Sequence, residues 1–255
     1  MSSKPVVETQ ELNMAYQAVP LGRASASWTF FLVAATWLLL LSIFHVFPAM
    51  DIAASSFFFR GALCRGGAEC GSFAFGRYEF IKLLRWALYV LPYIAAVTVV
   101  IAVTAGSLSK SIAAKMPMRR LWLSLATLGL STGLIVNLLL KSHTGRPRPV
   151  QTNFFGGHMD FMAAGSFLGQ CTSNCSFVSG EASGAGWLLC LIILLPPKAR
   201  LWFGRPVAIA SVATAVLRVV VGAHYMSDAI LGFLMPIVVF SGLIALEQRI
   251  LTSAR

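Results

Sequence analysis

The uncharged stretch "LWLSLATLGLSTGLIVNLLL" runs from Leu121 to Leu140, and charged side chains stand directly at both of its ends, at Arg120 and Lys141. An α-helix needs about 20 consecutive apolar residues to cross the hydrocarbon core of a bilayer. The stretch therefore predicts a transmembrane helix over about 120–140, with its basic flanks at the two membrane surfaces.

The same apolar signal recurs along the whole chain. The sequence has 255 residues, of which 57% are hydrophobic, and its mean hydropathy is +0.77. This apolar content is higher than that of a soluble domain, and no polar segment is long enough to form a hydrophobic core of its own. We predict an all-α, polytopic membrane protein with six transmembrane helices, at about 28–48, 84–106, 120–140, 182–197, 206–222 and 227–246.

Basic residues predict how these spans are oriented. They concentrate in the 107–120 and 198–205 loops and in both terminal tails, and such an excess of Lys and Arg marks the cytoplasmic side. We expect one membrane domain over 28–248, between cytoplasmic tails at 1–27 and 249–255. The opposite loops are then 49–83, 141–181 and 223–226. The 49–83 loop is apolar enough to predict short helices lying in the membrane interface.

Five cysteines are present, and four of them form two close pairs in the loops predicted to be non-cytoplasmic. Cys64 and Cys70 form one pair, Cys171 and Cys175 the other. Two disulfides are expected if those loops face an oxidising compartment, and four ordinary thiols are the alternative. A zinc site is disfavoured, because neither pair has the CxxC spacing and histidines are few.

The formal net charge of +11 can be interpreted in several ways. In a soluble chain it would suggest nucleic acid, but no nucleic-acid-binding motif is present and we expect no such partner. Orientation of the spans and attraction to anionic headgroups account for part of the charge. The basic surplus would also suit an anionic substrate.

The segment "KSHTGRPRP", residues 141–149, follows the third predicted span. Its glycine and prolines end the helix and force a curling path, which can bring Lys141 and Arg148 to one point. Two convergent cations suit a phosphate group, and Arg adds a planar fork for two oxygens. The alternative is a cation cluster that snorkels to lipid headgroups; the segment alone leaves both open.

Two further polar segments lie at the same predicted membrane face. "SFVSGEAS", residues 176–183, begins the fourth span with Ser179, Gly180 and Glu181, and a helix N-terminus binds anions. Helix capping by Ser176 or Ser179 is the simpler reading, although it leaves Glu181 unexplained. In "RVVVGAHYMSDAI", residues 218–230, His224 and Asp228 have helical spacing, so Asp228 can orient one ring nitrogen of His224. An ordinary interfacial histidine is the alternative there.

Together the three segments supply three cations, a helix N-terminus and an oriented histidine, a set that suits phosphoryl transfer through a phosphohistidine. Their spacing resembles the three signatures of the type-2 phosphatidic acid phosphatase superfamily: Lys141 with Arg148-Pro149, then Val178-Ser179-Gly180-Glu181, then Arg218 with His224 and Asp228. The second signature usually ends in His, where this chain has Glu181. The third usually opens with Ser, where it has Leu217.

The resemblance implies a role for each matching residue. His224 is the expected nucleophile and Asp228 its orienting partner. The expected phosphate site comprises Lys141, Arg148, Arg218, Ser179 and Gly180. No cofactor and no metal are implied. Glu181 is expected either to protonate the leaving oxygen, the reading slightly favoured, or to hold Arg or Lys in place. In the second case the proton comes from water or from His143.

The substrate expected from this resemblance is a lipid phosphate at the periplasmic face of a bacterial inner membrane. "CSFVSGEAS" and "FFGGHMDF", residues 154–161, are similar to the lipid A phosphatase branch, and most similar to the 4′-phosphatases. The 150–174 loop is expected to form a wall that meets a bulky headgroup. Undecaprenyl pyrophosphate and phosphatidylglycerol phosphate are the alternative substrates. A phosphotransferase using the same residues, a transporter and a non-catalytic lipid-binding protein are the rival classes.

Overall fold

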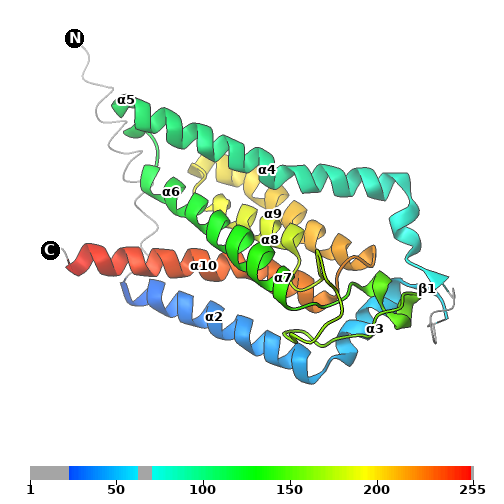
Figure 1. The fold of residues 1–255 in the computed structure, drawn as a ribbon. Helices are drawn as coiled ribbons and strands as arrows, with labels where there is room; N and C mark the ends of the chain where they lie inside the picture. The colour runs from blue at the N-terminus through cyan, green and yellow to red at the C-terminus, as the bar shows by residue number, and fades with distance from the viewer. Residues whose placement is uncertain (1–22, 63–70, 254–255) are drawn as a thin grey trace, which may run out of the picture.

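The computed structural model describes residues 23–62 and 71–253, which form a bundle of long helices (Figure 1). Helix α10 lies at the centre of the packing, where it contacts α2, α8, α9 and η2. The third span is continuous but changes its winding, from α6 through the π-helix η2 to the single turn α7. The long elements are α2 (Arg23–Val46), α4 (Glu79–Leu108), α6 (Met118–Thr127), η2 (Leu128–Leu140), α7 (Lys141–His143), α8 (Gly180–Ile192), α9 (Pro197–Val220) and α10 (Met226–Ser253).

Five of the six predicted spans are helices long and apolar enough to cross a membrane. They cover Ala26–Val46, Glu79–Leu108, Met118–His143, Pro197–Val220 and Met226–Ser253. The predicted fourth span, 182–197, instead contains a helix of 13 residues, α8. An apolar helix of that length is typical of a buried core element. The expectation of six full-length spans is therefore corrected to five spans and one short inner helix.

Helix α8 is enclosed by protein because its small residues let other helices approach closely. Ala182 to Leu188 are all buried. A Cβ on Gly186 would collide with the Phe233 carbonyl of α10, and one on Gly184 would touch Pro92 of α4. A helix shielded in this way does not need to match the hydrocarbon thickness by its own length.

The segments between the spans lie at the ends of the bundle, and the longest of them are 47–78 and 144–179. Within the predicted interfacial segment 49–83, α3 (Ala49–Phe58) and η1 (Ala74–Arg77) are indeed short helices. Strands β1 (Arg60–Gly61) and β2 (Gly71–Ser72) form an antiparallel pair between them, which the all-α prediction did not include. The remaining short helices are α5 (Lys110–Ala113), η3 (Pro149–Gln151) and η4 (Asn153–Phe155).

Successive long helices alternate in direction, with the short α8 included in the alternation (Figure 1). The start of α2 and the end of α10 consequently lie at one end of the bundle, and α3, α7 and β1 lie at the other. Helix α10 continues to Ser253, so most of the expected tail at 249–255 is helical. Most of the expected tail at 1–27 lies outside the described residues.

The cysteines of the α7–α8 connection form a disulfide. Cys171 and Cys175 are bonded, with their Cα atoms 5.7 Å apart. Cys190 is a buried free thiol on α8. The expected Cys64–Cys70 pair lies outside the described residues.

Candidate active site

A cavity of about 570 Å³ opens among α4, η2, α8 and α9 at the end of the bundle opposite the termini. Six of the eight predicted site residues line it, namely Lys141, Arg148, Gly180, Glu181, Arg218 and His224. The other two, Ser179 and Asp228, are fully buried next to it. Three segments far apart in the sequence therefore contribute to one cavity.

Lys141 and Arg148 converge because the chain turns sharply after α7. Gly145 adopts a left-handed conformation, with φ of 61°, which few other residues tolerate. Arg148 then donates from Nη2 and Nε to the carbonyl oxygen of Asn174, at 3.0 and 3.3 Å. Lys141 Nζ lies 3.5 Å from Oδ1 of the same Asn174. The expected convergence of the two cations is confirmed.

Arg218 reaches the cavity from the last turn of α9 and is only 3% exposed. Its Nη1 lies 3.0 Å from Oε1 of Glu181. Its Nε is buried and, within the described part of the chain, has no hydrogen-bond partner. A buried donor without a partner destabilises the protein, and an anion in the cavity would remove this cost by accepting its hydrogen bond.

The N-terminus of α8 borders the cavity through Gly180. A Cβ at this position would lie 2.8 Å from Asn137 Oδ1 and 3.1 Å from Lys141 Nζ, so glycine allows the helix end to approach the cation closely. First-turn amides of a helix lack partners within the helix and attract anions. The Ser179 hydroxyl instead accepts a hydrogen bond from the Ala182 amide at 3.3 Å and caps the helix. Ser179 is therefore a helix cap, as the simpler interpretation of the sequence predicted, whereas the position of Gly180 suits anion binding.

Glu181 lies between two guanidinium groups. Its Oε1 accepts from Arg85 Nη2 at 2.8 Å, its Oε2 lies 3.4 Å from Arg85 Nε, and Arg218 contacts Oε1 from the other side. The two guanidinium groups thus converge on one carboxyl group, whose oxygens are engaged by Arg85 and Arg218. The contacts therefore favour the second expected role, in which Glu181 holds arginine side chains in place.

Positive charge dominates the cavity as a result. Its lining contains the four cations Arg85, Lys141, Arg148 and Arg218, against the single carboxylate of Glu181. These groups converge in a partly enclosed space, where electrostatic interactions are stronger than in water. The arrangement is suited to bind a multiply charged anion such as a phosphate group.

His224 stands in the connection between α9 and α10, after the left-handed Gly222 (φ 67°). Its Nδ1 lies 2.8 Å from the carbonyl oxygen of Ser176 and 3.9 Å from Asp228 Oδ2. The expected direct bond to Asp228 is therefore replaced by a bond to the Ser176 carbonyl, because α10 begins only at Met226 and the two residues do not share a helical face. With Nδ1 engaged, Nε2 is the ring nitrogen that remains for chemistry.

The charge state of His224 suits a nucleophile. Burial, followed by the positive charges of Arg218, Arg148 and Lys141, holds the pKa of His224 well below its usual range. The imidazole is therefore neutral near pH 7, with a lone pair on the nitrogen that bears no proton.

Asp228 belongs to a buried network behind His224. Its Oδ2 accepts from the Ser176 hydroxyl at 2.5 Å and from the Tyr225 amide at 2.9 Å, and its Oδ1 accepts from Arg146 Nη1 at 2.5 Å. Arg146 also donates to Asp51 Oδ2 at 2.7 Å. The Ser176 hydroxyl, 3.3 Å from His224 Nδ1, links this network to the histidine. Asp228 is thus linked to His224 through the Ser176 hydroxyl.

Four residues of this arrangement were not assigned a role from the sequence: Asp51, Arg85, Arg146 and Asn174. Ser176 was considered only as a possible helix cap. A signal existed for two of them. Asp51 is a lone carboxylate in the apolar stretch "FPAMDIAASSFFF", and Arg85 is a cation at the start of a span, positions that tend to be functional in membrane proteins. His143, the alternative proton source, bonds the Leu139 carbonyl at 2.7 Å and is not among the residues that line the cavity.

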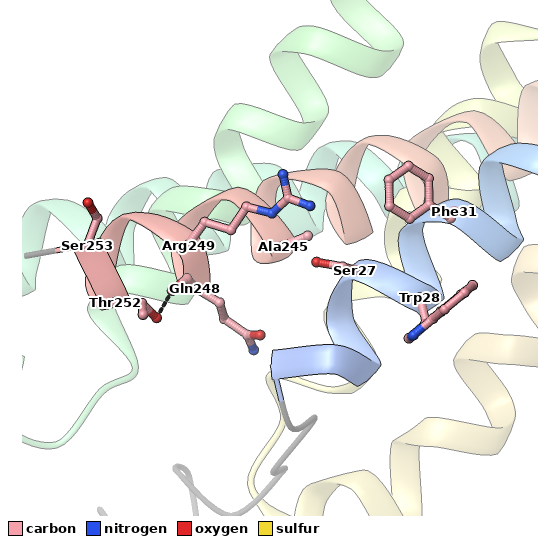
Figure 2. Close-up of a pocket in the computed structure, with 8 residues that line it drawn as sticks. All are labelled: Ser27, Trp28, Phe31, Ala245, Gln248, Arg249, Thr252 and Ser253. Carbon is pink, nitrogen blue, oxygen red and sulfur yellow. Dashed lines mark hydrogen bonds between the residues drawn. The ribbon is translucent and has the colours of Figure 1, made fainter.

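A second cavity, of about 590 Å³, lies between α2 and α10 at the end of the bundle that holds the termini (Figure 2). Trp28, Phe31 and Ala245 contribute apolar surface, and Arg249 is the one charged residue among the described residues that line it. Because this lining offers neither a histidine nor a carboxylate, it lacks the groups that phosphoryl transfer requires.

Known proteins share both the sequence and the fold. The model of the PAP2 superfamily, the type-2 phosphatidic acid phosphatases, matches residues 120–250. A lipid A 4′-phosphatase of Rhizobium leguminosarum is 42% identical over 221 residues, which are 83% of this chain and 93% of that protein. One from Rhizobium etli is 42% identical over 86% of this chain and 87% of its own length.

A more distant relative and a solved structure agree with these matches. The lipid A 4′-phosphatase of Francisella tularensis subsp. novicida is 28% identical over 73% of this chain and 81% of that protein. The crystal structure of a PAP2-type phosphatidylglycerolphosphate phosphatase from Bacillus subtilis covers 88% of this chain and 98% of its own, with a TM-score of 0.53. At 17% sequence identity, that likeness concerns the fold.

Proposed function

The chain belongs to the PAP2 superfamily, and from that premise we propose that it is a lipid A 4′-phosphatase, a phosphoric monoester hydrolase that releases phosphate from a membrane lipid. The observation that carries the proposal is the meeting of four cations and a neutral histidine in one cavity, within a chain that is 42% identical to two lipid A 4′-phosphatases along most of its length.

The proposed reaction has two steps. His224 attacks phosphorus through Nε2; the N–P bond forms as the bond from phosphorus to the sugar oxygen breaks, and that oxygen takes a proton to leave as an alcohol. Water then attacks the phosphohistidine, the N–P bond breaks, and phosphate leaves with the histidine neutral again. The Ser176 carbonyl at Nδ1 stabilises the positive charge that the ring gains in the first step.

The cations stabilise the charge on the phosphoryl group during transfer. Lys141, Arg148 and Arg218 bind its oxygens, with the amide end of α8 at Gly180 beside them. These groups supply positive charge of the kind that a metal supplies in other phosphoryl-transfer enzymes, and we propose that no metal and no cofactor take part. Activity should then survive excess chelator; a loss of activity that added metal restores would contradict the metal-free reaction.

Glu181 is proposed to act on the cations, and Arg85 is proposed as its partner. Its carboxylate fixes Arg218 from one side and Arg85 from the other, which is supported by the contacts of 3.0 and 2.8 Å. Water then supplies the proton for the leaving oxygen. Ser179 contributes by capping α8, and Asp228 by fixing Ser176 beside the histidine.

We propose that the protein lies in a bacterial inner membrane, with its active site facing the periplasm and both termini in the cytoplasm. The excess of Lys and Arg near the end of the bundle that holds the termini supports this orientation. The Cys171–Cys175 disulfide beside the site supports an oxidising compartment at the other end.

Mass spectrometry of lipid A tests the proposal. Cells that express the protein should lose one phosphate from lipid A, at the 4′ position, and cells with His224→Ala should not. We expect His224→Ala to lower phosphate release on the order of 10⁴-fold or more, since binding cannot replace a covalent nucleophile. Unchanged lipid A with folded protein in the membrane would redirect the assignment to undecaprenyl pyrophosphate or phosphatidylglycerol phosphate, or to transfer onto another acceptor.

A further inference from the structure

The five-residue loop Cys171–Cys175 touches both cations of the first signature through one residue. The main-chain oxygen of Asn174 accepts from Arg148 Nη2 at 3.0 Å and Nε at 3.3 Å, while its Oδ1 lies 3.5 Å from Lys141 Nζ. Of the described residues other than glycine, Asn174 alone has a positive φ, 47°. Asn tolerates this left-handed conformation better than most residues.

The loop is fixed to the segment that carries the cations. The disulfide closes it, and Cys171 and Cys175 are buried, so the bridge faces the protein. The Cys171 amide donates to the Gly145 carbonyl at 2.8 Å, and the Ser176 amide donates to the Arg146 carbonyl at 2.8 Å. The position of the Asn174 carbonyl is thereby set by contacts on both sides of it.

We propose that Asn174 is a positioning residue for phosphate binding: its main-chain carbonyl, held in place by the left-handed conformation and the disulfide, aims Arg148 at the phosphate. The identity of the phosphate ester rests on the proposed function. The positioning of Arg148 rests on the geometry of the loop. Neither Asn174 nor the disulfide belongs to the three signatures.

The chemistry of the contact explains why a carbonyl serves better here than a carboxylate. Two N–H donors of Arg148 point at Asn174, which leaves both Nη1 donors and one Nη2 donor for a ligand. A neutral acceptor orients the guanidinium and offsets part of the repulsion between Arg148 and Lys141. It does not neutralise their charge, which remains available to the phosphate.

Two substitutions separate the main chain of Asn174 from its side chain. Asn174→Gly keeps the left-handed conformation accessible and removes only the long Lys141 contact. Asn174→Val disfavours that conformation, because a β-branched residue rarely adopts a positive φ, and so turns the carbonyl away from Arg148. We expect the Gly variant to bind phosphate within about threefold of wild type and the Val variant about tenfold more weakly, the size of one charge-assisted hydrogen bond.

The experiment is isothermal titration of inorganic phosphate into the purified full-length protein. Each Asn174 variant is measured in the wild-type background and again in the Arg148→Met background. If Asn174 acts through Arg148, Asn174→Val should weaken binding in the wild-type background and have little effect in the Arg148→Met background. Cys171→Ser/Cys175→Ser should reproduce the Val result. Ser173→Val, an exposed neighbour in the same loop, is the matched control and should leave binding unchanged.

Two results would overturn the proposal. One is an equal loss for Asn174→Val in both backgrounds, which would mean a general disturbance of the loop. The other is an equal loss for Gly and Val, which would assign the effect to the side chain. Should Asn174→Val not fold, Asn174→Ala, which disfavours a positive φ more mildly, takes its place in the same cycle. The titration needs no lipid, so a failure of the proposed lipid A activity would leave this test intact.

Discussion

Two groups of charged side chains flank His224, and they differ in how their charges are balanced. Behind the histidine, Arg146 is fully buried between Asp51 and Asp228 and donates to both. On the cavity side, four cations share the one carboxylate of Glu181, and the buried Nε of Arg218 has no partner among the described residues. Arg146 and Arg148 belong to the two different groups although they are two residues apart in the sequence.

This difference distinguishes charges that stabilise the fold from charges whose donors are open to a ligand. A buried charge whose donors are all used by the protein contributes to structure, and removing it leaves its partners unpaired. A cluster with surplus positive charge is costly in the free protein and becomes favourable when an anion binds.

Arg146→Met should have the largest effect, and it should be on stability. It leaves two buried carboxylates without their cation, which costs about 3–5 kcal/mol of unfolding free energy. Thermal unfolding of the detergent-solubilised protein measures this. An Arg146→Met variant as stable as wild type would mean that the buried network does not hold the fold.

Arg148→Met is the matched variant and should act on activity. We expect phosphate release to fall about 100-fold, the loss of charge-assisted hydrogen bonds to the transferred group, with little change in the melting temperature. Kinetic assays and unfolding on the same preparation give both values. A loss of stability as large as that of Arg146→Met would remove the distinction between the two arginines.

Inorganic phosphate should stabilise the wild-type protein. Ligand binding to the folded state alone raises stability by about 2.7 kcal/mol when its concentration is 100 times the dissociation constant. The rise in melting temperature should vanish in Arg218→Met and persist in Asp51→Asn if that variant folds. Stabilisation that survives Arg218→Met would show that the anion binds elsewhere.

Glu181→Gln should slow phosphate release about tenfold, since it weakens the hold on Arg85 and Arg218 while leaving the cations present. As a positioning residue it should slow lipid A and a substrate with a good leaving group equally. A selective loss with lipid A would instead restore the general-acid role, because only a poor leaving group needs a proton.

The smallest effect concerns pH. Because burial and the neighbouring cations lower the pKa of His224, the neutral nucleophile persists as the pH falls and is lost only below the usual histidine range. The acid limb of kcat/KM should therefore lie below about pH 6.5. An acid limb above that value would mean that the cavity cations do not act on His224.

Much of this site could be predicted because its residues lie in short local patterns. Lys141 and Arg148 lie in one short segment that begins at α7, and Gly222 sets the turn before His224, so the local chain path brings them to one end of the bundle. Asp51, Arg85 and Asn174 could not be assigned in this way. Each lies in a separate segment, and its partner is known only once the helices have packed.

Apolar length and charge distribution along the chain were enough to predict a membrane-spanning helical bundle and the end of the bundle at which the candidate site residues lie. Both quantities are additive along a chain. Three features became visible only in the folded chain: α8 is a short inner helix, Ser176 stands between Asp228 and His224, and Glu181 pairs with Arg85 and Arg218. These depend on distances between segments remote in sequence, and such distances are set by packing.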